Sequence, residues 1–348
     1  MFIPTCANPF IANHQVFIFL YLMVTSNPSP DANDYLMFTK TSIMKRIFTL
    51  AALIFSIQIM AQKTGEKKPV VIFSSDKAIN VNTTELVGMG KMAFKVTHNF
   101  GDIGGKGGGI KNFYGLDNAA DIRIAFEIGL GKNFDITLAR SKGASQQQRL
   151  WEMNVKYRLM QQMENDPSHP LSILLFANAV VVSNKASSFP NLDHSFTSFG
   201  DRTSTVLQLV LARKMGKVSL ALEPTFLTRS YSISYDQKNL FALGGAIKLP
   251  LVANRLNLVV DYFHTFRNQS SKDSFFLLNN GIKFYDPLGI GFEILTAGHI
   301  FRLNFTNATE ILENRFIPRT ITTWGKGQFR WGFTISRMFT LWREKKKK

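Results

Sequence analysis

Cysteine is almost absent from this sequence. One cysteine, Cys6, occurs in 348 residues, so a fold stabilised by disulfides within the chain is excluded. Uninterrupted apolar runs of about 18 to 20 residues, the length that a membrane-spanning helix needs, are also lacking outside one N-terminal segment. A bundle of membrane helices is therefore not expected.

Acidic residues are scarce as well. The 24 Asp and Glu face 41 Lys and Arg, and the resulting formal charge of +17 permits an anionic partner. No nucleic-acid-binding motif accompanies this charge, so nucleic acid is not an expected partner. Lipopolysaccharide phosphates and the anionic headgroups of outer-membrane lipid are the more natural partners for basic residues at a membrane surface. With 45% hydrophobic residues, the chain is expected to fold.

The one long apolar stretch has the order of a secretory signal peptide. Residues 44–61 begin with a basic pair, Lys45 and Arg46, and pass through a short apolar run to Ala61, where cleavage is expected. A short anchor helix or a buried core helix is the alternative. Because a signal peptide works at the start of a chain, residues 1–43 are interpreted as the product of a start codon assigned too far upstream. The mature chain then has no cysteine, which suits an oxidising compartment.

Beyond Lys91 the dominant pattern is alternation of apolar and polar residues with period two. Every even-numbered residue of 122–130 is apolar, and so is every odd-numbered residue of 151–159. On a helix these side chains would surround the circumference, so strands are predicted. Twelve such segments are separated by turn-forming residues: 92–99, 121–130, 134–141, 150–159, 171–182, 203–213, 218–235, 240–249, 256–266, 274–285, 289–306 and 327–342.

The count of twelve depends on two long segments. Segments 218–235 and 289–306 could each be a hairpin, and in 289–306 the apolar phase slips from even to odd positions near Ala297 and Gly298. Twelve strands are predicted, with fourteen as the alternative.

The segments have the length and connections of a transmembrane β-barrel. Strands of about 9 to 11 residues suit a tilted bilayer crossing, whereas soluble strands have about 5 to 6. The connections at 101–120, 183–202 and 307–326 are long, and most of those between are brief. In hydrocarbon every backbone N–H and C=O needs a protein partner, which a sheet achieves by closing on itself. An all-β antiparallel barrel over residues 91–342 is predicted, with a soluble β-sandwich as the alternative.

The parts outside the strands receive separate interpretations. Residues 62–90 are either a periplasmic arm or a plug in the lumen, and residues 343–348 form a basic, solvated tail. The Gly-rich run 101–109 is a flexible loop rather than a phosphate-binding loop, because no helix pattern follows it. The aromatic residues of 112–120 are expected to fold this loop back across the barrel mouth.

Charged residues on the polar face of the strands are predicted to face the lumen, where opposite signs can pair across strands. A slight basic excess would favour anions if an aqueous path exists. The alternative is that these charges only neutralise one another. The predicted lumen-facing charges are Lys95, Arg123, Glu127, Glu152, Lys156, Arg158, Asp261, Glu293, Arg302 and Arg330.

The last segment looks like the closing strand of outer-membrane barrels, whose alternating aromatic C-terminus is read by the assembly machinery. One departure is that residues 343–348 follow the last aromatic residue, where the usual pattern ends the chain. The residues assigned to this strand are Phe329, Trp331, Phe333, Ile335, Phe339 and Trp342.

Five strings of the sequence carry a family resemblance. They are HNFGDI at 98–103, NFYGLDNAADIRIAFEIGL at 112–130, VKYRL at 155–159, GHIFRLNFTNA at 298–308 and WGKGQFRWGFTISRMF at 324–339. In this combination the chain resembles a family of uncharacterised membrane-bound β-barrel outer-membrane proteins of Bacteroidota. The resemblance implies a membrane-bound barrel, and it supplies no activity, substrate or catalytic residue.

Patterns for catalysis and metal binding are weak. None of the five His residues after position 61 has metal-ligand spacing to another His, Cys or acidic pair, so no metal is expected, and no cofactor either. A lipid hydrolase would need Ser, His and an orienting polar group at the outer rim. His264 with Ser270 or Ser271 is available in composition only, so no enzyme is predicted.

The sequence therefore predicts an outer-membrane β-barrel that acts as a narrow porin-like channel or transporter for small polar or anionic solutes. The alternative is a closed barrel that serves as a structural or partner-docking platform without transport. A barrel-embedded lipid-modifying enzyme comes third. Lumen width, solute and oligomeric state are left open by the sequence.

Overall fold

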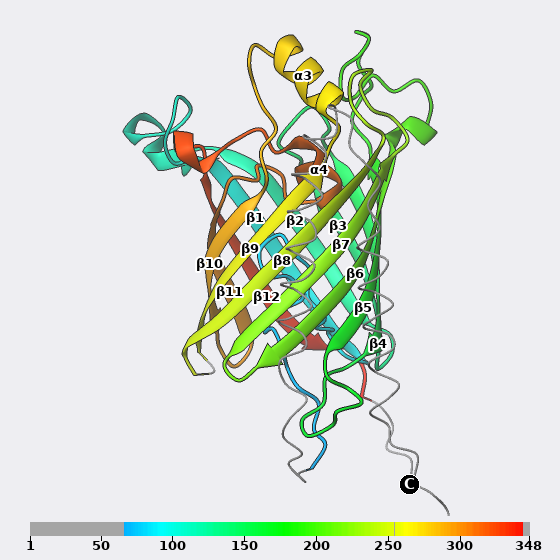
Figure 1. The fold of residues 1–348 in the computed structure, drawn as a ribbon, viewed down its shortest axis with the longest axis vertical. Coiled ribbons are helices and arrows are strands. Elements are labelled where there is room, and N and C mark those ends of the chain that lie inside the picture. The colour runs from blue at the N-terminus through cyan, green and yellow to red at the C-terminus, as the bar shows by residue number, and fades with distance from the viewer. Residues whose placement is uncertain (1–65, 254, 344–348) are drawn as a thin grey trace, which may run out of the picture. The chain divides into compact units, whose positions relative to one another are not determined.

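A computed structural model describes residues 66–253 and 255–343, and in these residues the sheet is a closed barrel of twelve antiparallel strands (Figure 1). Each strand pairs with the next along the chain, and β12 pairs with β1. The predicted all-β barrel of twelve strands is thereby confirmed. The strands are β1 Lys91–Asp102, β2 Ala119–Gly129, β3 Phe134–Ser141, β4 Leu150–Met160, β5 Ser172–Val182, β6 Thr203–Met215, β7 Val218–Arg229, β8 Asn239–Val252, β9 Leu256–Phe266, β10 Leu288–Leu295, β11 His299–Thr306 and β12 Arg330–Thr340.

The two ends of the barrel differ in the length of their connections. At one end, called the turn end, most connections are brief, such as 216–217 and 296–298. At the other, the loop end, they are longer and carry short helices. These helices are η1 Ile110–Gly115, η2 Gly200–Arg202, α3 Gln269–Leu278, α4 Glu313–Arg319 and η3 Trp324–Lys326. None of the helices in the described residues is long and apolar enough to cross a bilayer.

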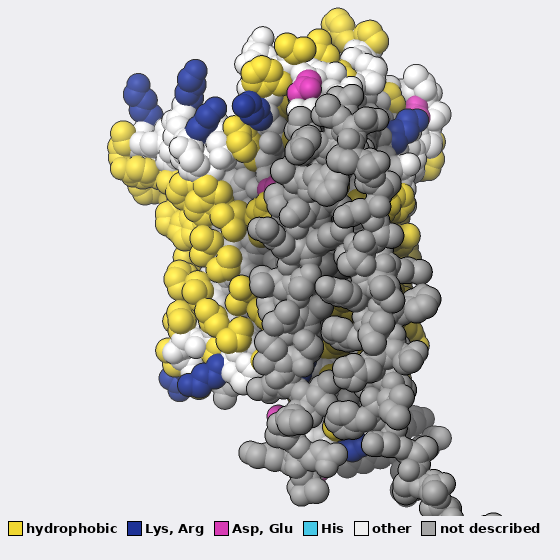
Figure 2. Space-filling view, viewed as in Figure 1, with side chains coloured by type: hydrophobic (Ala, Val, Ile, Leu, Met, Phe, Trp, Pro, Cys, Tyr) yellow, Lys and Arg dark blue, Asp and Glu magenta, His cyan; other side chains and the backbone are white. Residues whose placement is uncertain are grey.

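The alternation of the sequence becomes two surfaces in the barrel. On β2, Ile124 and Phe126 point outward and are 42% and 44% exposed, whereas their neighbours Arg123, Ala125 and Glu127 are buried on the inner face. Hydrophobic side chains cover the visible part of the outer wall in Figure 2. This outer surface is suited to hydrocarbon for two reasons: its side chains are apolar, and the closed sheet leaves no strand with unpaired backbone groups.

Two predicted segments differ from the structure, and their effects on the strand count cancel. The strand predicted at 274–285 is wrong: α3 and the coil after it occupy this region, and the Asn268 side chain caps the helix by accepting from the Ser271 N–H. The apolar residues there are consecutive rather than alternating, so they do not specify a strand. Segment 289–306 is instead the hairpin of β10 and β11, which turns at 296–298, where the apolar phase slips.

Two further segments enter the lumen from opposite ends. Residues 69–90, hereafter the lumen segment, rise from the turn end, and residues 307–323, hereafter the lumen loop, descend from the loop end with α4 (Figure 1). Ile72 and Phe73 of the lumen segment and Phe316 of the lumen loop belong to one buried cluster with wall side chains.

The expectation that the loop at 101–120 covers the mouth is wrong. Its Phe113 and Tyr114 are 57% and 48% exposed, and the lumen loop lies inside the barrel instead. The interpretations of residues 1–43 and of the signal peptide at 44–61 concern residues outside the described part of the chain. The basic tail also lies outside it from residue 344 onward.

Candidate functional site in the barrel lumen

The lumen segment is fastened at the turn end and forms a hairpin-like loop inside the barrel. Where it enters, the Val70 N–H donates to the Gln162 carbonyl at 2.9 Å, in the connection between β4 and β5. Where it leaves, the Gly90 N–H donates to the Gly129 carbonyl at 2.9 Å, at the end of β2. Between these points Ala78 N–H donates to the Val81 carbonyl at 2.8 Å, so residues 78–81 form the tip.

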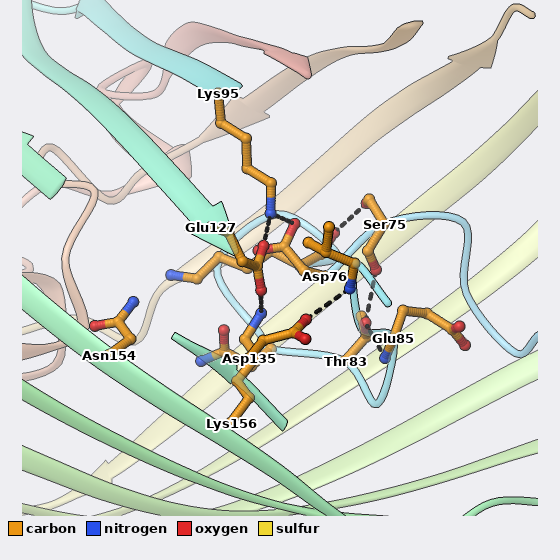
Figure 3. A network of polar contacts seen from close by, with 12 residues as sticks. Ser75, Asp76, Thr83, Glu85, Lys95, Glu127, Asp135, Asn154 and Lys156 are labelled. Carbon is orange, nitrogen blue, oxygen red and sulfur yellow. Dashed lines mark hydrogen bonds and ion pairs between the residues drawn. The ribbon is translucent and has the colours of Figure 1, made fainter. Parts of the chain in front are cut away.

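On one side of this loop, Asp76 completes a buried ionic cluster (Figure 3). Its carboxylate lies 2.7 Å from the Lys95 Nζ on β1 and 3.2 Å from the Lys156 Nζ on β4. Both lysines also pair with the fully buried Glu127 of β2, Lys156 at 2.8 Å. Two wall cations therefore share two carboxylates, and one of these carboxylates comes from the lumen segment.

At the tip, the polarity of the contact is reversed, because wall carboxylates bind backbone amides. Asp261 of β9 accepts from the N–H groups of Ile79, Asn80 and Val81 at 2.9, 2.5 and 2.9 Å. Glu223 of β7 accepts from the Asn82 N–H at 3.1 Å. Hydrogen bonds to a charged acceptor are stronger than neutral ones, and here they hold a segment that has no ladder partner along most of its length.

The remaining side of the lumen segment packs on an apolar part of the wall. Ile72, Phe73 and Val81 are at most 2% exposed. They belong to a cluster whose wall members include Leu174, Phe176, Val206, Val210, Val259 and Phe263, all on strands between β5 and β9. The lumen segment thus contacts the ionic cluster of β1, β2 and β4 on one side, and on the other side an apolar part of the wall that also carries Asp261 and Glu223.

The lumen loop meets the tip of the lumen segment inside the barrel. The fully buried Glu313 at the start of α4 forms an ion pair with Lys77 and accepts from the Asn82 side-chain amide at 2.9 Å. Phe316 packs on Phe263, with ring centroids 5.2 Å apart. The two segments therefore form one continuous internal structure.

Arginines of α4 fasten the lumen loop to the loop end. Arg319 lies 2.7 Å from Asp193, and Arg315 contacts the same carboxylate at 3.6 Å. Burial alone would raise the pKa of Asp193, but the two guanidinium groups outweigh burial and hold this pKa below its usual value. We call Asp193, Arg315 and Arg319 the loop latch.

Most of the charges assigned to the lumen from the sequence lie on the inner face, and several are brought together. Lys95, Glu127 and Lys156 meet at Asp76, and Arg123 pairs with Glu152 at 2.6 Å. The others take separate places: Asp261, Glu293 and Arg302 contact the lumen segment, Arg330 pairs with Asp102 at the loop end, and Arg158 is half-buried at the turn end, near Asn133.

The partners of these charges were not identified from the sequence. They include Ser75, Asp76 and Asn80 of the lumen segment. The contact of Asn82 with Glu313, between the two internal segments, was not identified either. Residues 75–83 read SDKAINVNT, a run in which short polar residues are mixed with Ala78, Ile79 and Val81 and which is too short for a spanning strand. This run was the available signal that the segment makes irregular polar contacts.

The predicted C-terminal assembly strand corresponds to β12, which closes the barrel. Trp331, Phe333, Ile335 and Phe339 share its outer face, and Phe329 lies just before the strand. Trp342 lies beyond the strand, where its backbone N–H donates to the Gly90 carbonyl at 3.1 Å. The Trp342 backbone thereby contacts the end of the lumen segment.

At the rim, His264 and Asp286 form a titratable pair that faces outward. His264 of β9 lies 2.8 Å from Asp286, and Tyr262 donates to the same carboxylate at 2.5 Å. Burial would raise the pKa of Asp286, but the hydrogen bonds from His264 and Tyr262 leave it below its usual value. The partner of His264 is this carboxylate rather than Ser270 or Ser271. No group of three or more His, Cys, Asp or Glu side chains could hold a metal ion within residues 66–253 and 255–343.

Comparison with known families places most of the chain in a family of membrane barrels. The family described as a membrane-bound beta barrel domain (DUF5777) matches residues 73–339. The matched region begins within the lumen segment and ends within β12. A search of curated proteins finds no match.

Solved structures give weaker likenesses. The NanC porin has 6% identity and a TM-score of 0.41, over 72% of this chain and 98% of that one. The KdgM porin in complex with disordered oligogalacturonate has 8% identity and a TM-score of 0.42, over 71% and 99%. An outer membrane channel from Pseudomonas putida F1 has 10% identity and a TM-score of 0.40, over 74% and 98%. At such TM-scores these likenesses carry no argument about activity.

Proposed function

The chain belongs to the family of membrane-bound β-barrel domains, and from that premise we propose that it is an outer-membrane channel for small polar or anionic solutes, held closed by its own lumen segment. The long-looped end would then face the cell exterior and the turn end the periplasm, as in bacterial barrels generally. In this arrangement the lumen segment enters from the periplasm.

One observation carries the proposal: wall charges in the lumen take their partners from the lumen segment. Lys95 and Lys156 bind Asp76, and Asp261 binds three backbone amides of the tip. Water can replace each of these partners at modest cost, because polar groups exchange one hydrogen-bonding partner for another. A barrel that served only as a rigid support could fill its lumen with apolar side chains.

The charge pattern supports a polar solute. With the lumen segment withdrawn, Lys95 and Lys156 would lose Asp76 and keep the wall carboxylates Glu127 and, opposite Lys156 on β3, Asp135. Glu223 lies on β7, six strands from β1 and hence across a ring of twelve. Opposed charges across a lumen favour solutes that are themselves polar, and the freed lysines favour those that carry an anionic group.

The direct test is single-channel conductance in planar bilayers. We expect the full chain to be closed most of the time and a variant that lacks residues 71–87 to conduct steadily, with a reversal potential that favours anions. Val70 and Gly90, which fasten the ends of the lumen segment, are kept in this variant. Because the lumen loop also occupies the lumen, a second variant additionally replaces residues 310–321 with a short Gly-Ser connection.

A second candidate function is a closed barrel that serves as a docking platform. The observation that favours it is the continuity of the lumen segment with the lumen loop through Glu313, Lys77 and Asn82. If both variants insert as folded barrels and neither conducts, the channel proposal is wrong and the platform is favoured.

A further inference from the structure

The loop between β1 and β2, residues 103–118, packs against the connection that contains η3. The Ile103 N–H donates to the Phe329 carbonyl at 2.7 Å, and the Gly104 N–H donates to the Gly327 carbonyl at 2.9 Å. We call residues 103–118 together with η3 the rim ledge. In Figure 1 the rim ledge projects sideways beyond the barrel wall at the upper left, where η1 is cyan and η3 is red.

The rim ledge exposes apolar side chains that folding would ordinarily bury. Ile110 is 73% exposed, Phe113 57%, Tyr114 48% and Leu116 39%. None of these side chains contributes to the internal contacts of the lumen. Water is a poor solvent for such a surface, so its exposure in the isolated chain indicates a further contact.

The backbone that presents these side chains is strained. Phe113 and Tyr114 have φ values of 43° and 54°, the left-handed region that aromatic residues rarely adopt. The conformation is fixed by hydrogen bonds within the loop: the Gly109 N–H donates to the Ile103 carbonyl at 2.9 Å, and the Tyr114 N–H donates to the Gly109 carbonyl at 2.8 Å. The loop is therefore ordered, and its aromatic residues are held outward at a cost in backbone energy.

Basic side chains accompany the apolar ones. Lys106 and Lys111 of the loop and Lys326 of η3 are exposed. In Figure 2, Lys and Arg side chains stand on the upper side of this projection, and hydrophobic side chains lie beneath them and continue into the hydrophobic wall. Trp324 of η3 stacks on Phe329, just before β12, with centroids 4.3 Å apart, and on the adjoining wall Phe305 of β11 lies 4.5 Å from Trp331 of β12.

We propose that the rim ledge is an interfacial lipid-binding site. The apolar side chains of the ledge enter the outer leaflet, and the lysines of the ledge bind the phosphates of anionic lipid headgroups. Two observations select lipid as the occupant. The apolar surface of the ledge is continuous with the lipid-facing wall, and its charge is complementary to phosphate. An apolar surface with Lys above it is the arrangement of a segment that lies in a membrane interface.

The apolar residues of α3 provide an internal control. Leu277 and Leu278 are 76% and 64% exposed, as much as the side chains of the ledge. However, α3 stands above the barrel in Figure 1 rather than beside its wall. The proposal therefore separates two equally apolar surfaces by their height relative to the bilayer.

The test uses nitroxide labels at single cysteines in a Cys6→Ser background. Labels at Phe113→Cys and Ile110→Cys are compared with a label at Leu277→Cys, in vesicles of phosphatidylcholine alone and of phosphatidylcholine with phosphatidylglycerol. We expect the ledge labels to collide with oxygen more than with a water-soluble nickel chelate, and the Leu277→Cys label to show the reverse. Ledge labels that are as accessible to the chelate as the Leu277→Cys label would overturn lipid insertion.

The lysines are tested in the same vesicles. The triple variant Lys106→Gln, Lys111→Gln and Lys326→Gln is expected to reduce the depth of the Phe113→Cys label in the vesicles that contain phosphatidylglycerol and to leave it unchanged in phosphatidylcholine alone. An equal effect in both lipids, or no effect in either, would overturn the assignment of the lysines to anionic headgroups. These outcomes do not depend on whether the lumen conducts.

Discussion

The two halves of the inner wall have different chemistry. Strands β5 to β9 carry nearly all the large buried apolar side chains of the wall, Leu150 of β4 being the exception. The other half, β10 to β12 and β1 to β4, carries ten buried charged residues against four on β5 to β9. An apolar wall must stay covered to be stable, whereas a charged wall tolerates water. Under the channel proposal, the apolar half therefore holds the internal segments, and the charged half provides the path.

The largest effect is expected on the apolar half. Phe73→Ala removes a side chain that is 2% exposed, and large-to-small changes of this kind cost about 3–5 kcal/mol. Since each 1.4 kcal/mol is a factor of ten, the open fraction in single-channel recordings should rise about 100-fold or more. Val71→Ala is the matched control, because Val71 is the next residue but one and is 61% exposed. If both variants remain closed alike, packing on the apolar half does not hold the lumen segment.

A smaller effect is expected on the charged half. Asp76→Asn removes the charge that Lys95 and Lys156 share at 2.7 and 3.2 Å, and hydrogen bonds to charged groups contribute about 1.5–3 kcal/mol. The open fraction should rise roughly tenfold to a hundredfold, and the reversal potential should move towards anions. Glu66→Gln is the control, since Glu66 pairs with Lys68 at the surface. If the open fraction changes and the reversal potential does not, Lys95 and Lys156 do not line the conducting path.

The smallest effect concerns the loop latch and depends on pH. The folded pKa of Asp193 lies below its ordinary value of about 3.9, so the latch stabilises the lumen loop above that pH and weakens as the pH falls below it. The rate of amide hydrogen exchange in α4, corrected for the intrinsic rate, should increase when the pH is lowered from about 4. In the Asp193→Asn variant, the α4 amides should exchange rapidly both at that pH and below it. An identical pH dependence in the two proteins would exclude Asp193 as the responsible group.

The outer surface of the barrel was largely predictable from sequence, and its interior was not. Lipid imposes strict alternation, so the bounds of β3 and β9 follow from the positions of their apolar residues alone. Alternation also identifies polar inward-facing residues such as Glu127. It does not give their partners, because Asp76, which pairs with Lys95 and Lys156, lies in an irregular segment whose position is set by tertiary contacts.

The wrong strand at 274–285 and the burial of the lumen loop, which the sequence analysis did not predict, both show the limits of local pattern. In α3 the apolar residues Phe275, Phe276 and Leu277 are consecutive, and only the Asn268 cap signals a helix. In the lumen loop, Glu313, Asn314 and Arg315 read as surface residues although each is at most 2% exposed. A buried charge with a distant partner cannot be distinguished from an exposed charge by local pattern. The burial of the internal segments could therefore be identified only from the structure.

The central claim is that movement of the lumen segment opens the barrel, and the most direct test follows one residue during gating. Ala78 at the tip is 1% exposed, so in a Cys6→Ser background Ala78→Cys should be protected from a hydrophilic, anionic thiosulfonate reagent while the channel is closed. Reagent applied during single-channel recording should react only during openings, and the bulky adduct should then prevent closure, giving an irreversible step to the conducting state. Complete modification without any change in conductance would contradict the account.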